Sequence, residues 1–263
     1  MLELKPLEPL DRRVAEVEAS IASPEFKKIF RAAVDRIDAE EYLRLQAKWQ
    51  EHLVHFNPKF VYKYFDVCFW IKDKIQRAKR LDLFDRPALR ILDLGTGAGH
   101  FPAVCAALGH EVVGLDVEVA LYADLARLMK VDRRIFALAP RRPLPDLGRF
   151  DVVTGVAVSF DSLGRDGAQA RRYWTLDDWA WLIRHLSEER MRYPGRLYFE
   201  LNYQVLADGA LRYDQALLQA CAAAGAEVLA DKGRISFAVN GPIVLGRDEP
   251  TDPLAERPIR SAT

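Results

Sequence analysis

The spacing of hydrophobic and polar positions separates the chain into a helical first part and an alternating second part. Residues 1 to about 80 are almost free of glycine and are predicted to be helical. Ser23 and Pro24 indicate a helix start, because serine caps a first turn and proline fits its first position. Asp38 indicates a second start, and a third helix is expected from about Val61 to Leu81.

After residue 85, short apolar runs alternate with helical segments, which indicates a parallel sheet with helices on both faces. Strands are predicted at residues 90–94, 111–116, 134–138, 150–156, 195–202, 226–231 and 234–239. Helices are predicted at residues 101–108, 117–131, 176–191 and 210–224, the third of them capped by Thr175. The last two strands are expected to form a hairpin around Lys232 and Gly233. The stretch from Arg247 to Thr263, rich in proline and charge, is expected to be poorly ordered.

The first strand runs directly into a glycine-rich turn. Gly95, Gly97 and Gly99 stand at every second position, and glycine lets the backbone turn sharply and approach a ligand closely. Asp116 closes the next strand, about 20 residues further along, where its carboxylate can accept hydrogen bonds from ribose hydroxyls. These features predict a site for a nucleoside-bearing cofactor.

The residues before and within the turn distinguish between cofactors. Nicotinamide enzymes carry Gly-x-Gly-x-x-Gly and place the pyrophosphate on the helix N-terminus. This chain has Gly-x-Gly-x-Gly, with Asp93 two residues before the first glycine. A carboxylate there would repel a pyrophosphate and would suit a ligand that carries an amino group and a sulfonium.

On these residues the sequence resembles the class I S-adenosylmethionine-dependent methyltransferases. Residues 93–99 are similar to their first motif, and residues 114–117 to the end of their second strand. The resemblance implies a Rossmann-like α/β fold, with a mostly parallel seven-stranded sheet, an antiparallel last strand and helices on both faces. The resemblance covers roughly residues 85–247, so the chain is predicted to divide into a helical N-terminal cap (1–84), an S-adenosylmethionine-binding domain (85–247) and a flexible tail (248–263).

The resemblance implies roles for individual residues. The glycine turn would pack against the methionyl part and the ribose, Asp93 would orient the amino group, Asp116 would accept from the ribose, and Val117 would touch adenine. The predicted cofactor-binding residues are Asp93, Gly95, Thr96, Gly97, Gly99, Asp116, Val117, Leu138 and Val156. The acidic residue that many relatives carry after the third strand is replaced here by an apolar stretch around Leu138.

The predicted activity is methyl transfer from S-adenosylmethionine to a small molecule, an in-line displacement in which the protein mainly aligns the reactants. A hydroxyl acceptor would also need a base, for which His100, Asp161 and Glu200 are candidates. The alternative for His100 is to cap its helix or face solvent, and the alternative for Asp161 is to cap the loop at residues 162–164. Oxygen, nitrogen and carbon acceptors all stay open. Two other functions also stay open: an NAD(P)-dependent oxidoreductase, and a non-catalytic S-adenosylmethionine-binding or assembly protein on the same fold.

An aromatic-rich stretch runs from Trp49 to Trp70. We expect it either to pack on the sheet domain or to form a lid over the acceptor, with Tyr62 or Tyr64 meeting the cofactor's cationic end. In the same stretch, His52 and His55 are three residues apart on one helix face, but no third ligand is evident, so no metal is expected.

Composition narrows the class of partner. The formal net charge is zero, so no basic excess favours a nucleic-acid partner. Three cysteines, few and odd in number, indicate reduced thiols in a cytoplasmic protein. No stretch is long and apolar enough to predict a membrane span. The sequence makes no prediction of oligomeric state.

Overall fold

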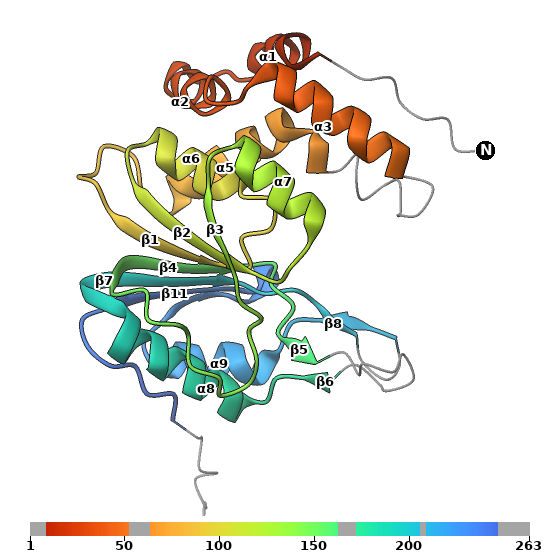
Figure 1. Cartoon of the computed structure of the whole chain (residues 1–263). Helices are drawn as coiled ribbons and strands as arrows, with labels where there is room; N and C mark the ends of the chain where they lie inside the picture. Colours follow the sequence, from red (N-terminus) through yellow and green to blue (C-terminus); the bar gives the residue numbers. More distant parts are fainter. Residues whose placement is uncertain (1–8, 53–63, 163–171, 206–208, 247–263) are drawn as a thin grey trace, which may run out of the picture.

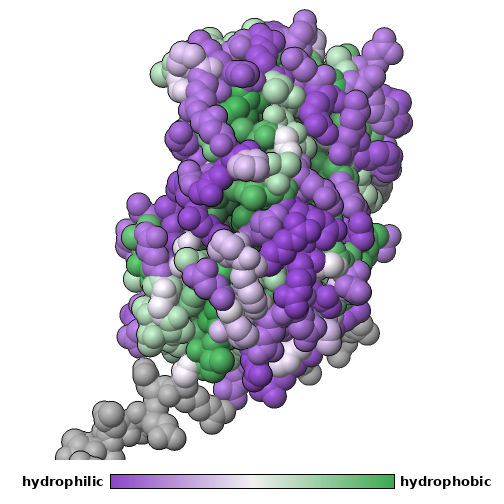
Figure 2. Space-filling model, turned by 90° about the vertical axis from the view of Figure 1, so that its left-hand side faces the viewer, coloured by the Kyte–Doolittle hydropathy of each residue, from purple (hydrophilic) through white to green (hydrophobic). Residues whose placement is uncertain are grey.

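The computed structural model describes residues 9–52, 64–162, 172–205 and 209–246. Figure 1 shows a central sheet with helices α5, α6 and α7 over one face and α8 and α9 over the other. Helices α1, α2 and α3 form an additional layer outside α5–α7. The face shown in Figure 2 is mainly hydrophilic, with hydrophobic residues visible in separate patches.

The central sheet has seven strands in the order β10-β11-β7-β4-β1-β2-β3. All neighbouring pairs are parallel except those of β11, which runs antiparallel to both β7 and β10. The predicted fold class is therefore confirmed, including the antiparallel last strand and the terminal hairpin. The strands are β1 (Arg90–Leu94), β2 (Glu111–Asp116), β3 (Asp132–Ile135), β4 (Phe150–Val156), β7 (Met191–Glu200), β10 (Glu227–Leu229) and β11 (Arg234–Val239).

Two short strand pairs lie outside this sheet. β5 (Asp161–Ser162) pairs with β6 (Arg172–Tyr173), and β8 (Gln204–Val205) pairs with β9 (Leu211–Arg212). The sequence analysis did not predict either pair. Both extend the loops that follow the carboxyl ends of β4 and β7, so they add walls to that edge of the sheet.

The predicted helix starts are confirmed by their caps. The Ser23 hydroxyl accepts from the Phe26 amide, and the Asp38 carboxylate accepts from the Glu41 amide at 2.8 Å. Thr175 forms a reciprocal capping box at the start of its helix. The helices are α1 (Leu10–Ala19), α2 (Pro24–Val34), α3 (Ala39–His52), α5 (Val67–Arg80), α6 (His100–Ala107), α7 (Ala120–Leu128), α8 (Leu176–His185) and α9 (Gln215–Ala223).

Several predicted boundaries were wrong for identifiable reasons. The third strand begins at 132 and not at 134, because Lys130 takes a positive φ of 56° directly after α7 and turns the chain at once. The helix predicted to 191 ends at His185 and continues as a π-helical turn, Leu186–Arg190, before β7. The last helix starts at 215 and not at 210, because Asp214 caps it and β9 uses the residues before it.

The remaining differences are shorter or shifted elements. The helix predicted at 117–131 spans 120–128, the strand predicted at 195–202 spans 191–200, and the strand predicted at 226–231 spans 227–229. In the described part, the third predicted helix begins after the cap Asp66, whose side chain accepts from the Phe69 amide. Predictions for Val61, Tyr62, His55 and the tail from Arg247 fall outside the described residues.

The hydrophobic core lies in two layers, one on each face of the sheet. The layer under α5–α7 includes the fully buried Ile71, Val104 and Leu125, and it continues without a break into α1, α2 and α3. The opposite layer packs α8 and α9 against the sheet through residues such as Leu182 and Leu217. The core thus crosses residue 84, while the division into cap and cofactor domain there stays a prediction.

The cysteines and helix lengths add two observations. Cys68, Cys105 and Cys221 are all buried and carry free thiols. Within the described ranges, none of the helices combines the length and the apolar character that crossing a bilayer requires.

Candidate cofactor site

A cavity of about 570 Å³ lies at the carboxyl ends of β1, β2 and β4, the edge of the sheet where ligands of open α/β folds bind. Side chains of helix α5 also line this cavity. Eight of the nine predicted cofactor-binding residues line it, and Gly99 instead caps the start of α6 with a positive φ of 88°. The predicted residues in the lining are Asp93, Gly95, Thr96, Gly97, Asp116, Val117, Leu138 and Val156.

The glycine turn needs its glycines for both conformation and space. Gly95 has φ 68°, and a Cβ on it would lie 2.4 Å from Cγ2 of Val158. Gly97 has φ 59°, and a Cβ there would meet no atom within 4 Å. Left-handed backbone disfavours other residues at both positions. The turn therefore packs tightly at Gly95 and leaves open space for a ligand at Gly97.

Asp116 holds the turn and the tip of β2 together. Its carboxylate accepts hydrogen bonds from the amides of Gly97 and Val117. Arg133 fastens the same two segments by donating to the carbonyls of Gly97, at 3.2 Å, and Val117. Each carboxylate oxygen has a second lone pair, so Asp116 can still accept from a ligand hydroxyl at the cavity.

Asp93 lies beneath the turn and is only 3% exposed. Burial raises the pKa of its carboxyl above the usual value, although the nearby Thr154 hydroxyl and Arg77 charge oppose the shift. The Thr154 hydroxyl donates to Oδ1 at 2.7 Å. A cationic group on a ligand would relieve the cost of keeping this carboxylate charged.

Three buried polar atoms of residues that line the cavity lack a hydrogen-bond partner: Oγ1 of Thr96, Nε2 of His100 and Nε of Arg77. His100 is 5% exposed and bonds to the Tyr64 backbone, and burial lowers its pKa to about 3. It is therefore neutral at physiological pH, a weak base, and offers Nε2 as an acceptor. Because buried polar groups are nearly always paired, these atoms fit a cavity that receives a polar ligand or ordered water.

The sequence analysis missed two cations on α5, Lys74 and Arg77, that line the same cavity. Lys74 contacts Asp73 at 2.6 Å and lies 4.5 Å from the centre of the Trp70 ring. Burial, and then the Arg77 charge, lower the pKa of its ammonium. Trp70, Lys74 and Arg77 follow at intervals of four and three residues, a helix-face spacing that could have revealed them.

The aromatic-rich stretch from Trp49 to Trp70 also contributes to the site. Tyr64 and Trp70 line the cavity, and the Tyr64 ring packs edge-on against Tyr122 with their centroids 5.1 Å apart. A role for Tyr64 at the cofactor's cationic end stays a prediction.

The three candidate bases fall in different places. Asp161 lines the cavity, as does His100. Glu200 is in the lining of neither this cavity nor the second one described below. Its carboxylate accepts from the Tyr198 hydroxyl and pairs with Arg80 at 3.3 Å and Arg234 at 3.1 Å.

The same partners set the acidity of Glu200. Burial alone would raise the pKa of Glu200, but the Tyr198 hydrogen bond and the surrounding arginines outweigh it and lower the pKa. Glu200 therefore has a structural role at the end of β7, where it forms ion pairs with two arginines.

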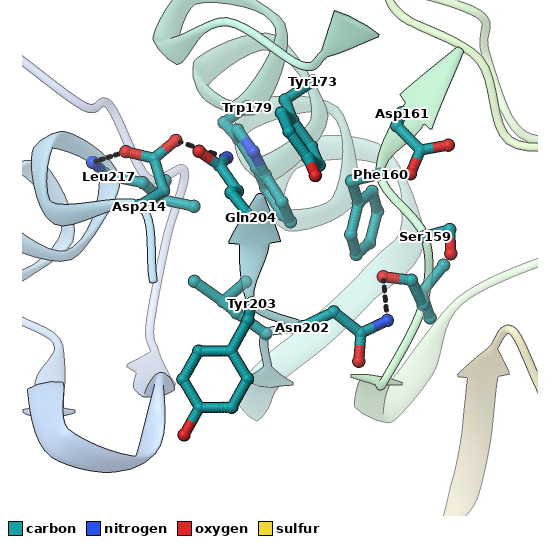
Figure 3. A pocket seen from close by; sticks show the side chains of 12 residues that line it. Ser159, Phe160, Asp161, Tyr173, Trp179, Asn202, Tyr203, Gln204, Asp214 and Leu217 are labelled. Atoms are coloured by element: carbon teal, nitrogen blue, oxygen red, sulfur yellow. Dashed lines mark hydrogen bonds between the residues drawn. The ribbon is translucent and has the colours of Figure 1, made fainter. Parts of the chain in front are cut away.

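A second cavity of about 280 Å³ adjoins the first, and Figure 3 shows it from close by. The two share Val158, Ser159 and Asp161 in their linings. A ligand in one cavity would thus lie next to a ligand in the other. Neither holds a metal centre formed by described residues, among which no group of three or more histidine, cysteine or carboxylate side chains comes together.

No model of a protein family matches the chain, and neither does any curated protein sequence. Several solved structures are similar to it at low identity. CalS10, an amino pentose methyltransferase from Micromonospora echinaspora, is 23% identical over 55% of this chain and 55% of its own, with a TM-score of 0.38. DesVI from Streptomyces venezuelae is 16% identical over 61% and 66%, with a TM-score of 0.42.

The glycopeptide N-methyltransferase MtfA is 15% identical over 51% of this chain and 54% of its own, with a TM-score of 0.36. The match thus spans about half the length of MtfA and of CalS10. At such TM-scores the likeness says nothing about activity. The fold is defined by the strand order of the sheet itself.

Proposed function

We propose that this protein transfers a methyl group from S-adenosylmethionine to a small molecule. The observation that carries the proposal is the convergence of Asp93, the glycine turn and Asp116 on one cavity that also holds unpaired buried polar atoms. When bound, S-adenosylmethionine supplies a methyl group activated by a sulfonium. Everything else required of the protein is binding, orientation and the exclusion of water.

The charges of the cavity suit the two ends of this cofactor. Asp116 would accept hydrogen bonds from the ribose hydroxyls. Asp93 and Nε2 of His100 would accept from the amino group of the methionyl part, and Arg77 with Lys74 would bind its carboxylate. A ligand with an ammonium and a carboxylate therefore matches a cavity that has both carboxylates and cations in its wall.

The second cavity, which adjoins the cofactor cavity, would hold the methyl acceptor next to the cofactor. Holding two reactants in line can supply up to about 7–11 kcal/mol of the barrier reduction in favourable cases. Asp161 would be the carboxylate that takes a proton from the acceptor, because it alone among the described carboxylates lines both cavities.

Thermal unfolding separates this proposal from the nicotinamide alternative. S-adenosylhomocysteine at a hundred times its dissociation constant should stabilise the protein by about 2.7 kcal/mol and raise Tm by about 5–10 °C. NAD and NADP at the same concentration should leave Tm unchanged, because the buried Asp93 opposes a pyrophosphate. A larger shift with NAD or NADP would refute the proposal. Tight binding of S-adenosylhomocysteine without transfer of a labelled methyl group to any metabolite would favour the non-catalytic alternative.

Replacing Arg77 with glutamine tests the assignment of the carboxylate-binding end. R77Q should weaken S-adenosylhomocysteine about tenfold, since a hydrogen bond between charged groups contributes about 1.5–3 kcal/mol and Lys74 remains. It should leave the affinity for 5′-methylthioadenosine unchanged, because that compound lacks the amino-acid part. R80Q, on the same helix but outside the cavity lining, is the matched control in calorimetry. Equal losses for both ligands would show that Arg77 supports the fold and does not bind the carboxylate.

A further inference from the structure

The second cavity has aromatic walls and polar ends. Figure 3 shows the rings of Tyr173, Trp179 and Phe160 between Asp214 and Gln204 on one side and Asp161 on the other. Phe160 and Trp179 contact each other with their centroids 4.2 Å apart, and both belong to the hydrophobic core on the α8 and α9 face of the sheet. The walls are therefore fixed by packing.

The charged side chains among the described lining residues of this cavity are carboxylates. Asp161 and Asp214 line it, and no lysine, arginine or histidine is among its described lining residues. The cofactor cavity next to it differs, because Lys74 and Arg77 line that one. Aromatic rings and carboxylates together favour a cationic ligand over a neutral or an anionic one.

The hydrogen-bonding groups indicate the same polarity. Asn202 uses an amide N–H to donate to the Val158 carbonyl at 3.3 Å, and Gln204 uses one to donate to Oδ2 of Asp214 at 3.4 Å. Both amide carbonyl oxygens can therefore accept a hydrogen bond from a ligand. A ligand that fits this lining is one rich in N–H donors.

We infer that the second cavity binds a small organic amine in its ammonium form, as the methyl acceptor. The inference rests on the proposed function and narrows the acceptor to nitrogen. Before it can act as a nucleophile, the ammonium must lose one proton. Asp161 takes that proton, which converts ammonium and carboxylate into neutral amine and carboxylic acid at the junction of the two cavities.

The test uses three probes of the same shape: benzylamine, benzyl alcohol and benzoate. Each is titrated into the full chain by calorimetry, with and without saturating S-adenosylhomocysteine. Benzylamine should bind at least about tenfold more tightly than benzyl alcohol, and benzoate should not bind. The variant D214N keeps a good helix cap for α9 while removing a charge. It should weaken benzylamine about tenfold and leave benzyl alcohol and S-adenosylhomocysteine unchanged. D231N, at an exposed aspartate outside both cavities, should change none of these affinities.

The outcomes distinguish a failure of the amine assignment from a failure of the proposed function. Binding of S-adenosylhomocysteine together with equal affinity for benzylamine and benzyl alcohol would overturn the amine assignment and leave the proposed function standing. So would no binding of benzylamine, tight binding of benzoate, or an unchanged benzylamine affinity in D214N. Failure of S-adenosylhomocysteine to bind would instead overturn the proposed function.

Discussion

Replacing Asp116 with alanine is expected to weaken the binding of S-adenosylhomocysteine about a hundredfold, which is a loss of about 2.7 kcal/mol. The carboxylate is placed to accept from the ribose hydroxyls, and hydrogen bonds to a charged acceptor contribute about 1.5–3 kcal/mol each. D116A also removes the acceptor for the Gly97 and Val117 amides, so the glycine turn loses part of its support. Isothermal calorimetry measures the change directly.

Two further variants make the result interpretable. D116N keeps one oxygen as an acceptor and should lose less affinity than D116A. D132A removes an aspartate on the neighbouring strand β3 whose partner is the exposed Arg134, and it should bind S-adenosylhomocysteine like the parent protein. An affinity in D116A equal to that of the parent, with the fold intact by circular dichroism, would remove Asp116 from the site.

Local sequence signals were sufficient to predict the bounds of four of the seven strands of the central sheet. β1, β2, β4 and β11 match their predicted bounds, because each is an apolar or alternating run closed by glycine, an acidic residue or a turn. Boundaries failed where a distant partner or a single backbone angle decides the end. Lys130 starts β3 early through a positive φ, and β9 replaces the first turn of the predicted last helix because it pairs with β8.

The same difference between local signals and distant contacts determines which residues of the site could be predicted from the sequence. Residues 93–99 and Asp116 are predictable because one strand, one turn and the next strand bring them together within a short stretch. Lys74 and Arg77 reach the cavity from α5, which precedes the sheet in the chain, and only packing of that helix on α6 places them there. The second cavity combines β5, β6, β8 and the start of α9, so its lining follows from tertiary structure. Glu200 is the last residue of β7, and Arg80 and Arg234 bind its carboxylate, a pairing across the tertiary structure that the sequence did not predict.

Replacing Asp124 with alanine is expected to destabilise the protein by about 3 kcal/mol, the cost typical of breaking a buried charged pair. The Asp124 side chain is 7% exposed and connects α7 to α3. It accepts from Nζ of Lys48 at 2.6 Å and from Nε1 of the buried Trp49 at 3.0 Å. D124A removes the acceptor while both donors stay in place, and chemical denaturation measures the loss. R127A is the control, because Arg127 contacts the same carboxylate from an exposed position and should contribute less than about 0.5 kcal/mol.

The pH dependence of this contact has a defined sign. Burial alone would raise the pKa of Asp124, but its hydrogen bonds to Lys48 and Trp49 and the Arg127 charge outweigh burial and lower the pKa below its usual 3.8. A lowered pKa in the folded state means that the ionised carboxylate stabilises the protein above about pH 4 and that this contribution is lost as the pH falls through the lowered pKa. The difference in unfolding free energy between the parent and D124A should therefore be constant near neutral pH and shrink below pH 4. A difference that grew on acidification would show that Asp124 is held protonated in the folded protein and that the contact between α3 and α7 depends on packing, not on charge.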